Sequence, residues 1–142
     1  SGEAEATELW LIEARTKKAR LLLRGRNSSD VKKVLAEFSS LSFSLDEHYL
    51  YFNSAALATE GSIHRVDLKT GVVKFLLFGA GVDVIPRGRE RGNLLVLRSI
   101  IKGDQGRNVY AWVTSPEGKL LREIGEADGR AAATYIKNYV NA

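Results

Sequence analysis

The feature that most constrains the fold is a hairpin-like segment that occurs three times along the chain. Residues 9–25 align without gaps to residues 63–79, and residues 109–125 form a third, looser copy. Each copy has the pattern of a strand, a polar turn and a second strand. The two later turns end in Gly71 and Gly118, and glycine supplies the positive φ that tight hairpins require. This repetition predicts an antiparallel β protein built from successive hairpins.

A second type of hairpin precedes each of the two later copies. Residues 41–52 contain a strand, a turn and an aromatic strand in which Tyr49 and Tyr51 share one face, as the two-residue period of a strand demands. Residues 82–101 repeat this plan around a glycine-containing tip. Two hairpins in succession make a four-stranded antiparallel unit of about 40 residues, which is the size of one propeller blade.

The unit formed by residues 43–52 and 63–71 resembles a blade of the TolB-like and YVTN-like β-propellers. Those blades carry a Phe-Ser-Pro-Asp-Gly turn, an aromatic strand and a Val-Asp-x-x-Thr-Gly turn. This chain has Leu45 and Glu47 where the family favours Pro and Gly. The resemblance implies a short, incomplete propeller, because closed propellers need four to eight blades and this chain has room for about two and a half to three.

Two further segments lie outside these hairpins. Residues 30–38 place apolar side chains at helical spacing, so a short helix and an irregular loop both fit them. Residues 128–140 predict a helix with Asp128 near its N-cap. Its expected apolar face consists of Ala132, Tyr135, Ile136, Tyr139 and Val140. This helix would cover an open sheet edge or the end of the core, or would bind a partner.

We therefore expect an all-β fold, in a propeller-like arrangement of about three small antiparallel sheets with a C-terminal helix. The 142 residues suffice for one domain and are too few for two, so residues 3–142 form a single predicted unit. Ser1 and Gly2 have the pattern of a tag remnant.

Composition bears on the cellular compartment. The absence of cysteine excludes disulfides, thiolate chemistry and cysteine metal sites. The absence of methionine, including a starting one, indicates that the native N-terminus has been removed. An exported protein without its signal peptide fits this, and a trimmed cytosolic chain would look the same. Together with the family resemblance, we favour a periplasmic protein. No apolar run approaches the roughly 20 residues of a membrane-spanning helix, so no membrane span is expected.

The net charge of +4 is modest, and basic and acidic residues are interspersed. Nucleic-acid binders concentrate their positive charge on one face, so no nucleic-acid partner is expected. The densest basic cluster is Arg87, Arg89 and Arg91. It fits a solvated hairpin tip, and alternatively a secondary contact with an anionic partner.

No catalytic constellation is visible, and we expect neither enzyme activity nor a metal or other cofactor. Of the two histidines, His48 lies in a turn and His64 lies on a strand, where the aligned residue of the first copy is Trp10. That equivalence indicates a packing position for His64. The segment Gly103–Arg107 holds too few carboxylates for calcium and fits a hairpin turn.

The strongest binding candidate is the connection formed by residues 53–62, which is longer than a minimal hairpin loop. Long loops on rigid β scaffolds often carry recognition, although a tolerated insertion would look the same. The predicted partner-binding residues are Ser54, Leu57, Thr59, Glu60 and Ser62. Leu57 would be the apolar anchor and the others would be polar contacts.

By architecture, a chain with too few blades to close resembles the periplasmic immunity proteins of type VI secretion peptidoglycan amidases. The resemblance implies an inhibitor or immunity protein that blocks a cell-wall-degrading effector, a peptidoglycan hydrolase toxin, with the loop of residues 53–62. One alternative is a non-enzymatic, propeller-like interaction module of a membrane-associated complex. Another is an anionic-polymer binder that uses Arg87, Arg89 and Arg91, with affinity that collapses as salt rises.

Overall fold

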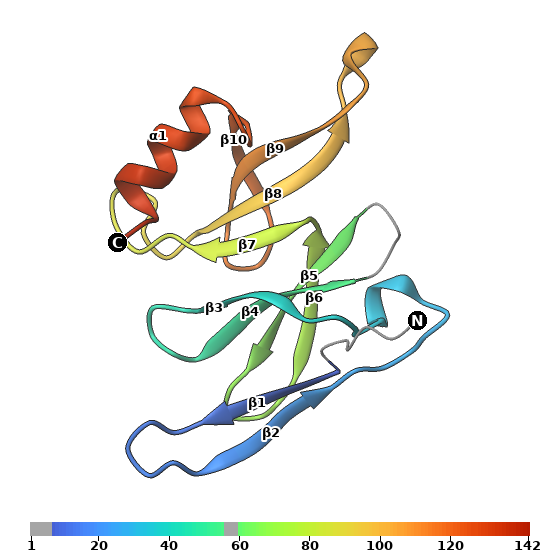
Figure 1. Cartoon of the computed structure of the whole chain (residues 1–142), viewed down its shortest axis with the longest axis vertical. Helices are drawn as coiled ribbons and strands as arrows, with labels where there is room; N and C mark the ends of the chain where they lie inside the picture. The colour runs from blue at the N-terminus through green and yellow to red at the C-terminus, as the bar shows by residue number, and fades with distance from the viewer. Residues whose placement is uncertain (1–6, 56–59) are drawn as a thin grey trace.

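The structure is a computed structural model that describes residues 7–55 and 60–142. It consists of three antiparallel sheets and one C-terminal α-helix, as the sequence predicts (Figure 1). The first sheet is β1 (Glu8–Ile12) and β2 (Ala19–Arg24). The second, the central sheet, is β3 (Ser39–Phe43), β4 (Tyr49–Ala55), β5 (Gly61–Asp67) and β6 (Val73–Phe78). The third is β7 (Gly81–Val84), β8 (Leu94–Ile101), β9 (Arg107–Thr114) and β10 (Leu120–Glu126).

All five predicted hairpins form. The three repeat copies are the β1–β2, β5–β6 and β9–β10 hairpins, and the second type gives β3–β4 and β7–β8. Each four-stranded sheet is a meander, with strand orders β3-β4-β5-β6 and β10-β9-β8-β7. Gly118, at the β9–β10 turn, has a φ of 90°, and a Cβ there would lie 2.8 Å from the Cβ of Leu76. Glycine is therefore required by both the turn and the close approach of the neighbouring sheet.

The central sheet is buried on both faces, because the other two sheets lie on either side of it (Figure 1). Along β4, Leu50 and Phe52 point into a cluster shared with the first sheet. Tyr51, between them, points into a cluster shared with the third sheet. On β5, Val66 belongs to the cluster shared with the first sheet and Ile63 to the cluster shared with the third sheet. Because successive side chains of a strand point to opposite faces, the central sheet packs against both of the other sheets.

The outer face of the third sheet is covered by α1 (Arg130–Tyr139). Ala132 and Tyr135 are buried there against Ala111 and Val113, whereas Tyr139 is 38% exposed, so the predicted apolar face is wider than the buried one. The N-cap is Gly129, one residue after the predicted Asp128. No helix within the described ranges has the length and apolar character to cross a membrane.

Residues 30–38 form neither a full helix nor an irregular loop. A single 3-10 turn, η1 (Val31–Lys33), is capped by the Asp30 carboxylate, which accepts a 3.1 Å hydrogen bond from the Lys32 N–H. The chain then becomes extended, and Leu35 forms an isolated bridge with Arg26. A second such turn, η2 (Gly103–Gln105), lies in the β8–β9 connection, where the sequence predicts a hairpin turn.

Candidate functional site

The predicted binding loop is shorter than the sequence indicates, because β4 and β5 remain paired up to Ala55 and Gly61. The connection proper is therefore residues 56–60, mounted on a hairpin whose register has no shift. Leu57 and Thr59 lie outside the described residues. Glu60 is described and half-buried.

Ser54 lies beneath this loop and is fully buried. Its hydroxyl accepts a 2.9 Å hydrogen bond from the Ala36 N–H and lies 3.2 Å from the carbonyl oxygen of Val34, to which it can donate. The Ala55 N–H donates in turn to the Ala36 carbonyl at 2.9 Å. These bonds tie the end of β4 to the segment after η1. Ser54 thus holds the base of the loop and presents no hydroxyl to a partner.

Ser62, at the other end of the loop, is also fully buried. Its hydroxyl lies 2.8 Å from His64 Nε2 and 3.4 Å from the Ser54 carbonyl oxygen. Beside it, a Cβ on Gly61 would lie 2.6 Å from the side-chain oxygen of Asn53, whose amide donates to the Gly79 carbonyl at 2.8 Å. Both serines are therefore part of a packed base that fixes the two ends of the connection.

The basic cluster lies on the tip between β7 and β8, as the sequence predicts. Arg87 donates from Nε to the Asn138 carbonyl at 2.9 Å and from its terminal nitrogen to the Asn141 carbonyl. Its guanidinium thereby binds main-chain oxygens at the end of α1. Arg89 and Arg91 are exposed. Arg87, one of the three predicted contact residues, is thus occupied by intramolecular hydrogen bonds.

A pocket of about 560 Å³ lies between this tip and α1, and Arg89 is part of its wall. At its centre Arg122 contacts Glu90 at 2.7 Å, and the Tyr135 hydroxyl donates to the same carboxylate at 3.0 Å. The hydrogen bond from Arg122 lowers the pKa of Glu90. Burial, followed by the bond to Glu90, raises the pKa of Tyr135 to about 12. Glu90 is therefore ionised at neutral pH and links the tip to both β10 and α1.

His64 is a core residue, with 1% of its surface exposed. Its ring stacks on Phe52 at 5.4 Å and meets the edge of Phe75 at 5.6 Å. Burial lowers its pKa to about 4, so the ring is neutral at pH 7. Nε2 faces Ser62, whereas the buried Nδ1 has no hydrogen-bonding partner among the described residues. A buried polar atom left unpaired costs about 1–3 kcal/mol, so Nδ1 calls for an explanation.

The face of the first sheet that points away from the central sheet is not covered by residues 7–55 or 60–142. Here Trp10 is 54% exposed and Ile12 is 62% exposed. The residues aligned with Trp10 in the other two copies are His64 and Tyr110, which are 1% and 4% exposed. His64 is paired with Phe52 on the face turned toward the first sheet, and Tyr110 shares the face of Trp112 and its partner Val96, which is turned toward the central sheet.

The same repeat position is therefore buried in two copies and more than half exposed in the first. The repeat indicates a packing position for His64, which is buried, whereas the aligned Trp10 has its side chain at the surface.

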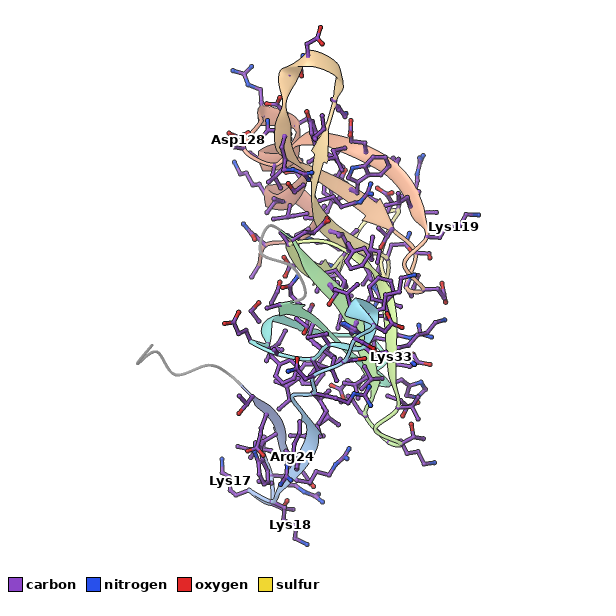
Figure 2. The ribbon with its side chains drawn as sticks, turned by 90° about the vertical axis from the view of Figure 1, so that its right-hand side faces the viewer. Lys17, Lys18, Arg24, Lys33, Lys119 and Asp128 are labelled. Carbon is purple, nitrogen blue, oxygen red and sulfur yellow. The ribbon has the colours of Figure 1, made fainter. Side chains whose placement is uncertain are left out.

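The hairpin that carries this face is strongly basic. Residues 7–26 hold six basic and two acidic side chains. One of the acids, Glu8, is paired with Arg24 at 3.0 Å. Lys17, Lys18 and Arg24 are labelled on this hairpin in Figure 2, at the end of the molecule opposite Asp128. The positive charge that looks evenly interspersed in the sequence is thus concentrated at one end of the fold.

Nothing in the described part of the chain gathers three or more His, Asp or Glu residues into a potential metal site. His48 is exposed and lies 3.4 Å from Asp46. The search of family models finds no match for the chain, and the search of curated proteins finds no relative.

Proposed function

We propose that this protein is a non-enzymatic binding module whose partner covers the outer face of the first sheet. The observation that carries the proposal is the exposure of Trp10 at a repeat position that is buried in both other copies. The opposite end of the molecule is covered by α1, so the two ends of the stack differ (Figure 1). Exposed aromatic and branched apolar side chains are typical anchors of protein interfaces.

The partner should present an apolar sheet face with an acidic rim. In the third copy the equivalent Tyr110 faces the central sheet, so a sheet is an element that fits here. Arg15, Lys17 and Lys18 lie in the β1–β2 turn, directly after Ile12 in the chain, and favour acidic side chains on the partner. The contact matches the interaction-module alternative, in which a propeller-like fragment docks onto a larger assembly.

The test is capture of partners from an extract of the source organism at physiological salt. A double variant, Trp10→Ser with Ile12→Ser, removes the proposed anchors. The matched control, Val72→Ser with Ile101→Ser, removes two apolar side chains that are 65% and 62% exposed elsewhere. We expect the native and control proteins to retain the same discrete partner and the anchor variant to lose it. Equal retention by all three proteins, or no discrete partner, would refute the proposal.

A second candidate is a periplasmic inhibitor or immunity protein that blocks a cell-wall-degrading effector with the β4–β5 loop. The packed base around Ser54, Ser62 and Gly61 supports it, because a loop with fixed ends pays less ordering entropy on binding. Ser54 and Ser62 anchor the loop in this version. Leu57, Thr59 and Glu60 supply the contacts. The roles of Leu57 and Thr59 are inferred from the sequence alone.

The two candidates make opposite predictions for one variant. Leu57→Ala with Glu60→Ala should abolish inhibition of a captured hydrolase if the loop blocks it, and should leave binding through the outer face unchanged. The Trp10 and Ile12 double variant serves as the reciprocal control. A retained hydrolase that stays active in an equimolar complex would exclude the inhibitor candidate.

A further inference from the structure

A second pocket, of about 490 Å³, lies between η1 and the β5–β6 part of the central sheet. We call it the basic pocket, because four of its nine lining residues are cationic. Its walls are Arg26, Asp30, Lys32, Lys33, Leu35, His64, Val73, Lys74 and Phe75. These residues come from three separate parts of the chain, brought together by the Arg26–Leu35 bridge and by strand pairing.

The positive charge of the basic pocket is not balanced by the described residues. Asp30 is the one acid in its walls, and its carboxylate already accepts the Lys32 N–H at the start of η1. Among residues 7–55 and 60–142, no ion pair joins a carboxylate to Arg26, Lys33 or Lys74. Four cations held around one cavity repel one another, and an anion between them relieves that repulsion.

His64 is the buried member of the pocket wall. It lines the basic pocket, is 99% buried, and its Nδ1 has no partner among the described residues. The Ser62 hydroxyl has one proton and lies closer to His64 Nε2, at 2.8 Å, than to the Ser54 carbonyl, at 3.4 Å. Nε2 therefore accepts from Ser62, and Nδ1 carries the ring proton. This donor is enclosed by the protein, so the ring contributes to the shape of the pocket wall and not a direct hydrogen bond to a ligand.

The rest of the wall is apolar. Leu35, Val73 and Phe75 form this part, and the Lys32 ammonium lies 5.4 Å from the centre of the Phe75 ring. The volume falls within the range of small-molecule sites, which is about 300–1,000 Å³. A ligand that combines an anionic group with a compact apolar group would contact both kinds of wall.

We propose that the basic pocket binds the phosphate group of a small phosphate monoester. Arg26, Lys32 and Lys33 contact the phosphate oxygens. Phosphate is favoured over a single carboxylate because it carries up to two charges and more acceptor oxygens, which match several cations. Phe75 and Val73 contact the ester group. This site is separate from the outer face of the first sheet and from the β4–β5 loop, so this proposal does not depend on the proposed function.

The test is titration of the isotope-labelled protein with inorganic phosphate and with phenyl phosphate, followed by amide NMR. We expect saturable shifts at residues 26, 30–35, 64 and 73–75 below about 10 mM ligand, with phenyl phosphate binding more tightly because it also reaches the apolar wall. Equal affinity for the two ligands would assign the site to the free ion. No saturable shift at these residues would refute the proposal.

Paired variants separate the site from general surface charge. Arg26→Gln with Lys33→Gln should weaken phenyl phosphate binding by about tenfold or more, because two charge-assisted hydrogen bonds are lost. The control, Lys119→Gln, removes an exposed lysine on the β9–β10 turn and should leave affinity unchanged. Lys33 and Lys119 are both labelled in Figure 2. An equal loss of affinity in the control and the double variant would show that the effect comes from net charge alone and would refute the site.

The two histidines supply a direct probe. Ligand binding should shift the ring nitrogen resonances of His64, whose ring is part of the pocket wall, and leave those of His48 in place. His48 is an internal reference because it lies exposed in the β3–β4 turn. Shifts at the amides without any change at the His64 ring would place the ligand away from the wall formed by Phe75 and His64 and would refute the proposed contacts.

Discussion

At the scale of single residues, His64 shows how burial fixes a protonation state. The ring is enclosed by Phe52 and Phe75, and burial lowers its pKa to about 4. An unfolded chain would protonate the same ring below about pH 6.5. Between these two values the unfolded state binds a proton that the folded state does not, so stability falls as pH falls.

We predict that the free energy of unfolding decreases by about 2 kcal/mol between pH 7 and pH 5 on account of His64 alone. Urea denaturation at a series of pH values measures it. His64→Gln retains an acceptor for the Ser62 hydroxyl and removes the titrating group, so its decrease over this interval should be smaller by that amount. Contributions from carboxylates cancel in the comparison, because both proteins contain them. Parallel curves for the two proteins would show that His64 is not the cause.

At the scale of elements, the hairpins could be predicted because their signals are local. Turn residues such as Gly71 and Gly118, and the two-residue alternation of Tyr49 and Tyr51, are encoded within a few positions of one another. The sequence does not reveal how far two paired strands extend. The predicted loop of residues 53–62 shrinks to residues 56–60 because cross-strand hydrogen bonds and the buried Ser54 and Ser62 continue the sheet.

The candidate sites were harder to predict, because they depend on contacts between distant segments. Trp10 aligns with the buried His64 and Tyr110, yet its own side chain is 54% exposed in the fold. The basic pocket joins Arg26, η1 and Lys74, which are far apart in the sequence. Sequence periodicity does not predict such contacts, because it shows which residues share one face of an element and not which residues pack against that face.

The attachment of α1 gives a prediction at this scale. Arg87→Ala should lower the free energy of unfolding by about 0.5–1.5 kcal/mol, because its guanidinium binds carbonyls at the helix C-terminus. Hydrogen exchange should accelerate at the Val140 amide, which donates to Ile136 in the last turn. Arg91→Ala is the matched control, because that side chain is exposed on the same tip. The same response in both variants would mean that the Arg87 contacts do not hold the helix.

At the scale of the whole molecule, the central sheet couples the two ends. Its two faces belong to different hydrophobic clusters, so the first and third sheets meet through β4 and β5 without touching the same residues. Ile63 and Val66 project from opposite faces of β5 but share one backbone. Unfolding of β5 therefore removes both side chains from their clusters at the same time. The layers should therefore unfold together.

The two tryptophans test this coupling, since Trp10 lies on the first sheet and Trp112 on the third. Proteins with Trp112→Phe or Trp10→Phe leave one fluorescent reporter at each end, and we predict the same urea midpoint after correction for the stability of each variant. Ile63→Ala, added to both, should lower stability by about 2–5 kcal/mol, because it opens a cavity at a fully buried position between the second and third sheets. Both reporters should move equally, although Ile63 does not belong to the cluster shared with the first sheet. If only the Trp112 signal moved, the first sheet would be an independently unfolding unit, and its uncovered face would then belong to a hairpin that can separate from the stack when a partner binds.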